Sequence, residues 1–288
     1  MRILLTGATG FIGRRLTSLL DERGHQIFCL LRPGTRCAAY ATPIPCDLAC
    51  CGSIKPLPAI DTIIHLAQSH QHRNFPLAAE DIFSVNTQAT AHLLDQARQG
   101  GVQRFIFAST SSVYSASNSP CQEDAVLRPD DFYAVTKLAA ETLLRPYERY
   151  FRICTLRLFT PYGPGQRARL IPVLVERVRE GRPVTLDGDE GGLRLSVTYI
   201  DDAASAFRSA AEEGWHGTYN VAAPEPTCLR EIANTIGRHV GIIPKFERTG
   251  RPEPPPLIAD LNRFALIGDS SKFCSLDEGI GRMLKQEA

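Results

Sequence analysis

Short apolar runs alternate with amphipathic segments along the first two thirds of the chain. The segments between the runs repeat apolar residues at helical spacing, as in residues 12–24, where Gly24 is suited to end the helix. Each run is typical of a strand buried on both faces; the runs cover residues 2–6, 26–31, 62–67, 104–109 and 153–159. Strands that alternate with helices indicate right-handed crossovers, so we predict an α/β fold with a doubly wound parallel sheet.

The pattern changes after Phe159, where a loop rich in proline and glycine leads to a helical segment at 170–181 and then to short strand candidates. A last short helix is expected near residues 276–284. We therefore predict two domains. The expected boundaries are a first domain over residues 1–160, to which 196–214 return, and a smaller α/β C-terminal lobe over 161–195 and 215–288.

Composition narrows the class of protein. The 288 residues can bury a sizeable core, and 43% hydrophobic with 22% charged residues is ordinary for a globular chain. The net charge is +1 and the arginines are spread along the chain, which argues against nucleic-acid or membrane-surface binding. No apolar stretch approaches the roughly 18 residues that span a bilayer, and the start does not resemble a signal peptide. We therefore expect a cytoplasmic location.

The nine cysteines are not typical of a disulfide framework or a metal centre. Their number is odd, and the densest group, Cys37, Cys46, Cys50 and Cys51, contains no Cys-x-x-Cys pair. We expect reduced thiols and no bound metal.

A glycine-rich turn follows the first expected strand. Gly7, Gly10 and Gly13 stand in "TGATGFIG", between that strand and the first expected helix. Glycines at this place let the backbone turn tightly and approach a pyrophosphate, whose charge is met by amide groups at the helix N-terminus. The turn therefore predicts dinucleotide binding by a Rossmann fold, and the alternative is a purely structural turn.

The end of the second expected strand bears on the choice of dinucleotide. An acidic residue usually stands there to bind a ribose 2′-hydroxyl, but this chain has Arg32 and Arg36 and no carboxylate before Asp47. A guanidinium suits a 2′-phosphate, so NADP is favoured over NAD. The alternative is that Arg32 is a solvated loop residue.

Beyond these residues, further motifs indicate a family. The chain resembles the extended short-chain dehydrogenases/reductases, in the NAD-dependent epimerase/dehydratase branch that works on nucleoside-diphosphate sugars. The resemblance covers nearly the whole chain, and its motifs occur in the family's order. They are "TGATGFIG" at 6–13, "CDL" at 46–48, "IIHLAQ" at 63–68, "VN" at 85–86, "ASTSSVY" at 108–114, "YAVTK" at 133–137, "RLFTPYGPG" at 157–165, "YIDDAA" at 199–204 and "YNVAAPEP" at 219–226.

The motifs and the resemblance together imply roles for individual residues. Thr110, Tyr133 and Lys137 are expected to be catalytic. The expected cofactor-binding residues, besides Tyr133 and Lys137, are Gly7, Thr9, Gly10, Phe11, Ile12, Gly13, Arg32, Arg36, Asp47, Leu48, Leu66, Ala67, Gln68, Asn86 and Phe159. The expected substrate-binding residues are Ser109, Thr110, Ser111, Thr160, Arg169, Arg194 and Arg251.

The spacing of Tyr133 and Lys137 suits proton transfer. Residues four apart share one face of a helix, and a nearby ammonium lowers the pKa of a phenol that is otherwise about 10. Tyr133 could then exchange a proton with a sugar hydroxyl while hydride moves at the same carbon, and Thr110 would hold the reacting oxygen. The alternative is an ordinary surface pair on a helix.

The resemblance leaves the reaction open. Dehydratases carry an acid pair after the catalytic threonine, and this chain has Ser111 and Ser112 there, so dehydration is not expected. Arg32 favours a 4-ketoreductase that uses NADPH. The alternatives are a 4-epimerase that retains NAD, a reductase of a non-nucleotide carbonyl, and a non-catalytic NADP-binding regulator.

The substrate is expected to be held by arginines. By the resemblance, Arg194 and Arg251 match arginines that clamp the diphosphate of a nucleotide sugar, with Arg167 and Arg169 as possible helpers. The alternative is that these are plain surface residues. Thr160 stands where the family usually has asparagine, which weakens the expected amide contact to the diphosphate.

Two further features concern the loop after the third expected strand and the helix of Tyr133. His70 and His72 either lie near the sugar or are solvated, because a metal site would need ligands that the sequence does not place. Family members often form a homodimer through the helix of Tyr133, and Pro146 should kink or end that helix.

Overall fold

The computed structural model of the chain describes residues 1–50, 56–188 and 190–286. Cys51, one of the four clustered cysteines, lies outside these residues. The chain divides into two compact units. The first comprises Met1–Ser115, Val126–Arg157 and Ala204–Tyr219; the second comprises Ala116–Ala125, Leu158–Ala203 and Asn220–Ala288.

A seven-stranded sheet, in the order β11-β6-β5-β4-β1-β2-β3, has most of its residues in the first unit. Its strands are β1 (Arg2–Thr6), β2 (Gln26–Leu31), β3 (Ala41–Pro45), β4 (Thr62–His65), β5 (Arg104–Thr110), β6 (Arg152–Leu158) and β11 (Gly217–Val221). β1 pairs in parallel with both β2 and β4, so Leu5 lies between Cys29 and Ile64. The predicted α/β fold with a parallel sheet is confirmed.

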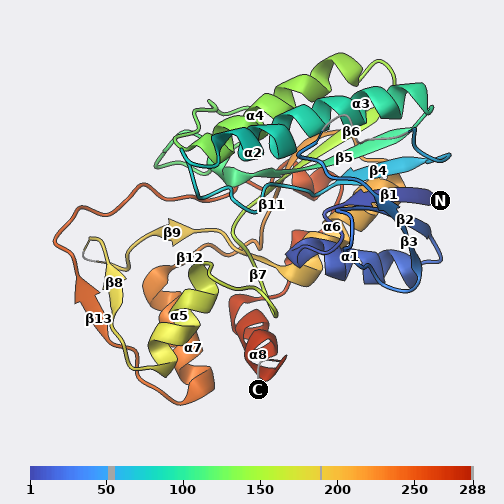
Figure 1. The fold of residues 1–288 in the computed structure, drawn as a ribbon. Helices are drawn as coiled ribbons and strands as arrows, with labels where there is room; N and C mark the ends of the chain where they lie inside the picture. The colour runs from blue at the N-terminus through green and yellow to red at the C-terminus, as the bar shows by residue number, and fades with distance from the viewer. Residues whose placement is uncertain (51–55, 189, 287–288) are drawn as a thin grey trace. The chain divides into compact units, whose positions relative to one another are not determined.

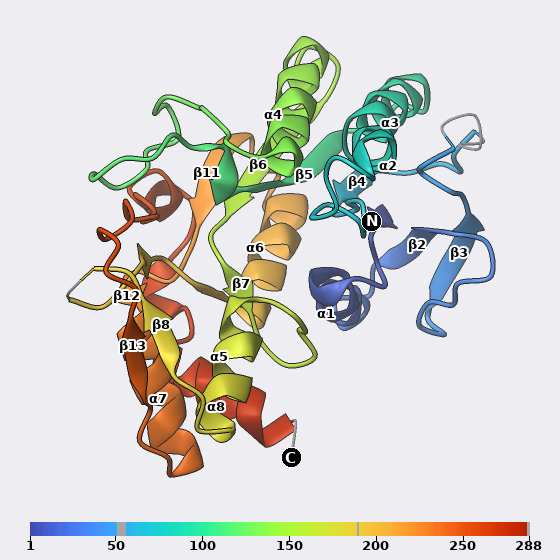
Figure 2. The ribbon, with the colours of Figure 1, turned by 60° about the vertical axis from the view of Figure 1, so that its left-hand side comes forward.

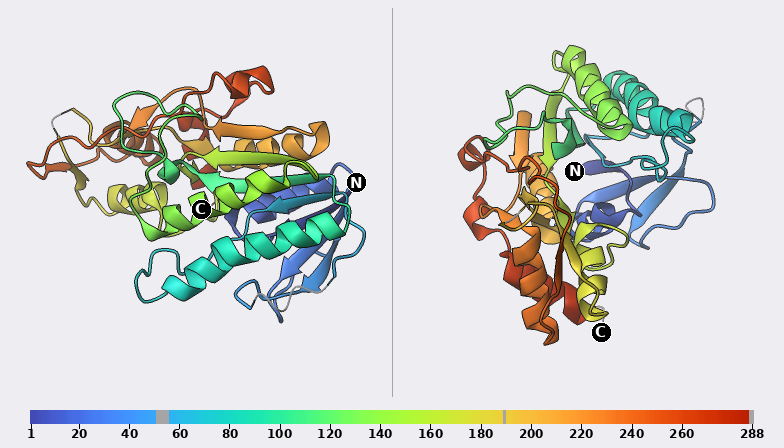
Figure 3. Two further views of the ribbon diagram at one scale, coloured as in Figure 1. Left: turned by 90° about the horizontal axis from the view of Figure 1, so that it is seen from above. Right: turned by 90° about the vertical axis from the view of Figure 1, so that its left-hand side faces the viewer.

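Helices cover both faces of this sheet. They are α1 (Phe11–Asp21), α2 (Ala79–Phe83), α3 (Ala89–Gln99), α4 (Phe132–Leu144) and α6 (Ile200–Glu213). α2, α3 and α4 lie on one face, and α1 and α6 lie on the other (Figure 1). α3 and α4 run side by side along the sheet (Figure 3). Because both faces are covered, strand residues such as Leu4 and Phe105 are fully buried and form the core.

Two local features of the helices follow from the sequence. α4 ends at Leu144 and passes into a single 3₁₀ turn at Arg145–Tyr147, because Pro146 cannot donate the next helical hydrogen bond. The prediction that this proline ends the helix is confirmed. Gly24 has a φ of 71° in the turn after α1, a backbone conformation that glycine adopts without strain.

The apolar pattern did not predict β3. Its sequence, "ATPIP", has two prolines, which cannot donate hydrogen bonds to a neighbouring strand. The prolines fit in the sheet because β3 is the edge strand and pairs on one side only, with β2. Proline is tolerated at such an edge, and it also protects the edge from further pairing.

The described part of the second unit combines α-helices with short strand pairs. The helices are α5 (Leu170–Arg179), α7 (Leu229–Val240) and α8 (Leu276–Gln286), and both α5 and α8 pack against α7 (Figure 2). The strand pairs are β7 (Pro161–Tyr162) with β10 (Thr198–Tyr199), β9 (Arg194–Leu195) with β12 (Thr227–Cys228), and β8 (Val184–Leu186) with β13 (Phe246–Arg248). The helices expected near 170–181 and 276–284 are confirmed. Within the described part of the chain, no helix has the length and apolar character needed to cross a membrane.

Candidate active site

The glycine-rich turn joins β1 to α1 and is shaped by close backbone contacts. Gly7 has a φ of 72°, and a Cβ there would meet the Ala67 amide nitrogen at 2.8 Å. A Cβ on Gly13 would lie only 2.0 Å from the Gly7 carbonyl oxygen, so α1 can approach the turn only with glycine at this position. A side chain at either position would force the backbone apart. This tight turn, at the N-terminus of an eleven-residue helix, fits a pyrophosphate.

Arg32 follows β2, and its guanidinium donates to His70 Nε2 at 3.2 Å. His70 lies in the loop after β4. Because β2 and β4 flank β1, this hydrogen bond crosses the carboxyl end of β1, where the glycine turn begins. Both side chains are exposed, as is Arg36. The guanidinium of Arg32 is therefore on the edge of the sheet where dinucleotides bind to such folds.

His65 is buried near the carboxyl ends of these strands, and the sequence pattern had not indicated a role for it. Its ring bridges two hydroxyls: Nδ1 lies 2.6 Å from Thr6 Oγ1 and Nε2 lies 3.0 Å from Thr90 Oγ1. Burial, with a smaller contribution from the Lys137 ammonium, lowers the pKa of His65 to about 3. A neutral ring thus ties β1, β4 and α3 together. The signal for it was the histidine in "IIHLAQ", inside an otherwise apolar run.

Thr110 is the last residue of β5, and its hydroxyl is engaged locally. It accepts from the Ser112 amide at 3.2 Å and donates to the Ser112 hydroxyl at 3.3 Å, so it caps the short 3₁₀ turn that follows. Ser109 precedes it and is buried, and its hydroxyl has no hydrogen-bond partner among the described residues. Ser111 is also buried. Hydroxyls therefore gather at the carboxyl end of β5.

α4 presents Tyr133 and Lys137 on successive turns. The helix begins after Asp131, whose side chain accepts from the Ala134 amide at 2.7 Å. The Tyr133 hydroxyl donates to Gln68 Oε1 at 2.9 Å. Lys137 is 2% exposed, and its ammonium lies 4.1 Å from the centre of the Phe107 ring. Burial lowers the pKa of Lys137 to about 7, and the carboxylate of Glu141 opposes this shift.

Asn86 joins the loop after β4 to α4. It lies in a π-helical turn, Ser84–Gln88, between α2 and α3. Its side-chain oxygen accepts from the Ser69 amide at 2.9 Å, and its side-chain nitrogen donates to Thr136 Oγ1 at 3.0 Å. Thr136 follows Tyr133 by three residues and donates to the Tyr133 carbonyl at 2.7 Å. One buried amide therefore links the loop to the turn of helix that carries the candidate catalytic tyrosine.

A buried ion pair lies one turn beyond Lys137. The Arg157 guanidinium donates to both carboxylate oxygens of Glu141, at 2.7 and 3.1 Å, and to the Tyr114 hydroxyl at 2.9 Å. The side chains of Arg157 and Glu141 are 4% and 9% exposed. The sequence placed Arg157 in a motif but assigned no partner to it, because the pair joins residues of different elements.

Four of the candidate substrate residues, Thr160, Arg169, Arg194 and Arg251, lie in the second unit. Arg194 lines a hollow of about 280 Å³ together with Thr227, Glu231 and Glu253. Thr160 has a φ of 33°, which is strained for a β-branched residue. Arg169 immediately precedes α5.

The remaining sequence-predicted residues have varied settings. Phe159 is fully buried and its amide donates to the Val221 carbonyl at 3.1 Å, so its side chain is part of the core of the second unit. Leu48 and Ala67 are buried, and the Asp47 carboxylate accepts from the Ala49 amide. Cys37, Cys46 and Cys50 take part in no disulfide within the described part of the chain.

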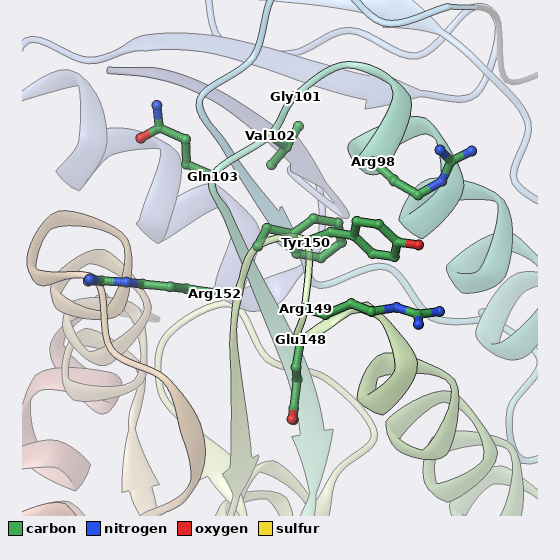
Figure 4. A pocket seen from close by; sticks show the side chains of 9 residues that line it. Arg98, Gly101, Val102, Gln103, Glu148, Arg149, Tyr150 and Arg152 are labelled. Carbon is green, nitrogen blue, oxygen red and sulfur yellow. The ribbon is translucent and has the colours of Figure 1, made fainter.

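A larger hollow, of about 490 Å³, lies at the opposite end of the strands, near the amino ends of β5 and β6 (Figure 4). It is lined by residues that lead into the amino ends of β5 and β6, including Gln103 and Phe151. Thr110 lies at the carboxyl end of β5. This hollow is therefore separate from the glycine turn and from the candidate catalytic residues.

Comparisons with known proteins agree with this arrangement. The model of the NAD dependent epimerase/dehydratase family matches residues 3–222. A curated relative, named uncharacterized UDP-glucose epimerase YtcB of Bacillus subtilis strain 168, is 33% identical over 236 residues, which cover 72% of this chain and 71% of the relative. A dTDP-4-dehydro-6-deoxy-D-allose reductase of a Streptomyces species is 28% identical over 296 residues, covering 93% and 90%.

A solved structure is similar over the full length. MoeE5 in complex with UDP-glucuronic acid and NAD superposes with a TM-score of 0.85 at 27% identity, covering 100% of this chain and 99% of that one.

Proposed function

The chain belongs to the NAD dependent epimerase/dehydratase family, a family of enzymes, and we propose that it moves hydride at C4 of a nucleoside-diphosphate sugar. The favoured reaction is reduction of a 4-keto sugar nucleotide by NADPH. The observation that carries the proposal is the pairing of Tyr133 and Lys137 on α4 with hydroxyls at the carboxyl end of β5, within the unit that holds the glycine turn.

Each residue has a distinct part in the proposed chemistry. The nicotinamide, when bound, supplies or accepts the hydride. Tyr133 gives its proton to the carbonyl oxygen as the alcohol forms, or takes it in the reverse direction. Lys137 stabilises the phenolate through its charge, and the partly protonated ammonium implied by a pKa of about 7 leaves that support sensitive to pH. Thr110 turns its hydroxyl from Ser112 to the reacting oxygen.

The rest of the cofactor site and the substrate site form the finer part of the proposal. Gly7, Gly10 and Gly13 bind the pyrophosphate, and Arg32 and Arg36 bind the 2′-phosphate of NADPH. In the second unit, Arg194 and Arg251, with Arg169, bind the diphosphate of the nucleotide sugar. The domain boundaries at residues 160, 196 and 214 are proposed on the sequence pattern and the homodimer through α4 on the resemblance, and the cytoplasmic location stays a prediction.

A second candidate function has its own support. Epimerases retain NAD, and the similar MoeE5 structure contains NAD. A 4-epimerase would need the same Tyr133, Lys137 and Thr110, with Arg32 pointing into solvent. A reductase of a non-nucleotide carbonyl is the third candidate, and it would make the arginines of the second unit dispensable.

Cofactor binding tests the proposal. The protein is denatured to identify any retained dinucleotide, and the cofactor-free protein is titrated with NADPH and NADH by nucleotide fluorescence. We expect NADPH to bind more tightly, and Arg32→Ala to weaken NADPH by about tenfold or more while leaving NADH unchanged. Arg145→Ala removes an exposed arginine of the same unit as the control.

Turnover of a dTDP- or UDP-linked 4-keto sugar with NADPH completes this test. If NAD⁺ is released only on denaturation and Arg32→Ala has no effect, the ketoreductase assignment is wrong and 4-epimerisation replaces it.

A further inference from the structure

The loop after β4 contacts the candidate catalytic residue Tyr133 on α4. Gln68 stands three residues beyond the end of β4, and its side-chain oxygen accepts a hydrogen bond from the Tyr133 hydroxyl at 2.9 Å. The same loop packs on the start of α4 twice more: the His72 ring lies 5.3 Å from the Tyr133 ring, and Phe75 stacks on Phe132 at 4.7 Å. The Thr110 hydroxyl, in contrast, bonds to Ser112.

The chemistry of this contact concerns the protonation state of the phenol. An acceptor that bonds to the neutral O–H favours the neutral form, so the Gln68 oxygen acts against the ammonium of Lys137. A carboxamide also carries two N–H donors on its other end, and rotation about its last torsion would present them to a phenolate. A glutamine can therefore bond to the tyrosine both before and after the proton moves. The thioether of a methionine is only a weak acceptor and cannot donate, and an ionised glutamate could only accept.

We propose that Gln68 is a positioning residue for the acid–base step, which holds the Tyr133 hydroxyl as a proton donor and turns its amide to the phenolate once the proton has moved. The inference rests on the proposed function, because it assigns Tyr133 the proton transfer. It extends the expected role of Gln68, which was to line the cofactor.

Other charged or titratable groups surround Tyr133 and have to be separated from Gln68. Lys137 lies one turn along α4 and is followed by Glu141, Asp131 caps the helix, and His72 contacts the tyrosine ring. Gln68→Glu places a carboxylate at the hydroxyl, and Gln68→Met keeps the length without a hydrogen bond. Gln71→Glu makes the same charge change in the same loop at an exposed site, and His72→Gln removes the nearby imidazole.

The first measurement is the pH dependence of kcat/KM. We expect Gln68→Glu to move the limb that reports Tyr133 to higher pH by about one to two units, while Gln71→Glu leaves it in place. Gln68→Met should lower kcat at every pH and leave the dissociation constant for NADPH within about twofold.

The second measurement needs no substrate. The absorbance of tyrosinate is titrated in the wild type and in Tyr133→Phe, and the difference reports Tyr133 alone; the variants are treated in the same way. A pKa of the Tyr133 transition that rises in Gln68→Glu but not in Gln71→Glu supports the proposal. This holds even if the protein turns over no nucleotide sugar, a result that would contradict the proposed function instead. If Gln68→Glu and Gln71→Glu titrate like the wild type, or if Gln68→Met alters only NADPH affinity, Gln68 lines the cofactor and the proposal is wrong.

Discussion

The two units of the molecule hold their candidate functional residues in different ways. In the first unit, Tyr133, Lys137 and Asn86 are tied by hydrogen bonds or burial to neighbours on several elements. In the second unit, Arg194 and Arg251 are exposed, and Thr160 has a strained backbone. Proton transfer needs fixed geometry, whereas binding a diphosphate needs donors within reach. We therefore expect substitutions in the first set to change both activity and stability, and substitutions of the exposed arginines in the second set to change mainly substrate binding.

The largest effect is expected at Lys137. Lys137→Met should lower kcat by about 10²–10⁴-fold, because it removes the charge that supports the phenolate. The same change should raise the free energy of unfolding by about 1–3 kcal/mol at neutral pH, since it removes a buried charge. Activity and stability would then move in opposite directions at one residue.

The pH dependence of this stability effect has a definite sign. The pKa of Lys137 is about 7 in the fold and 10.5 when unperturbed, so between these values the unfolded chain binds more protons. Wild-type stability therefore gains from rising pH in this window, and the advantage of Lys137→Met is largest at or below about pH 7 and shrinks above it. Urea unfolding at about pH 6 and about pH 9 checks this. An advantage that grows with pH would contradict the assignment.

The buried ion pair gives the next largest effect. Glu141→Gln leaves the Arg157 guanidinium buried without its counter-charge and should cost about 3–5 kcal/mol of stability. The control is Asp95→Asn, which breaks the exposed pair with Arg98 and should cost less than about 1 kcal/mol.

The double variant Glu141→Leu with Arg157→Met separates charge from packing. It should recover most of the stability lost in Glu141→Gln, because neither charge is left buried alone. Equal losses for Glu141→Gln and Asp95→Asn in urea unfolding would show that burial does not distinguish the two pairs.

The sequence predicted some features of the molecule and not others. The apolar runs predicted five strands of the sheet, β1, β2, β4, β5 and β6, and the segments between them predicted helices, because buried strands and amphipathic helices leave periodic signals. The glycine turn was predictable because only glycine has a Cβ-free backbone, and the contacts at Gly7 and Gly13 require it. The edge strand β3 was not predictable from apolar alternation, because its two prolines are uncommon in strands.

Pairings between distant residues left no such signal. Thr6 and His65 are 59 positions apart, and Glu141 and Arg157 belong to a helix and a strand. Periodicity describes one element at a time, so it places each side chain on a face but does not name its partner. For the same reason, the hydrogen bond from Arg32 to His70 could not be predicted from the sequence.

The substrate arginines should show the opposite balance from Lys137. Arg194→Ala should raise KM for the nucleotide sugar by about 10- to 100-fold through loss of charge-assisted hydrogen bonds to the diphosphate. Its stability should stay within about 0.5 kcal/mol, because the side chain is exposed. Arg238→Ala, at an exposed arginine of α7, is the control. An unchanged KM would favour the reductase of a non-nucleotide carbonyl.

Thr160 should give the smallest effect and the sharpest comparison within the second unit. Its φ of 33° is unfavourable for threonine, whereas asparagine tolerates the left-handed region. Thr160→Asn should therefore raise the free energy of unfolding by about 1 kcal/mol. Thr160→Gly also relieves the strain but gains less, because glycine adds freedom to the unfolded chain.

The two Thr160 variants also separate backbone strain from substrate binding. If the diphosphate reaches this loop, only Thr160→Asn supplies an amide donor, so only it should lower KM for the nucleotide sugar. Thermal unfolding and steady-state kinetics on both variants measure the two effects together. A lower KM in Thr160→Gly as well would mean that loop geometry, rather than the amide, limits binding. Substrate binding in the second unit would then depend on fixed backbone geometry, as proton transfer does in the first.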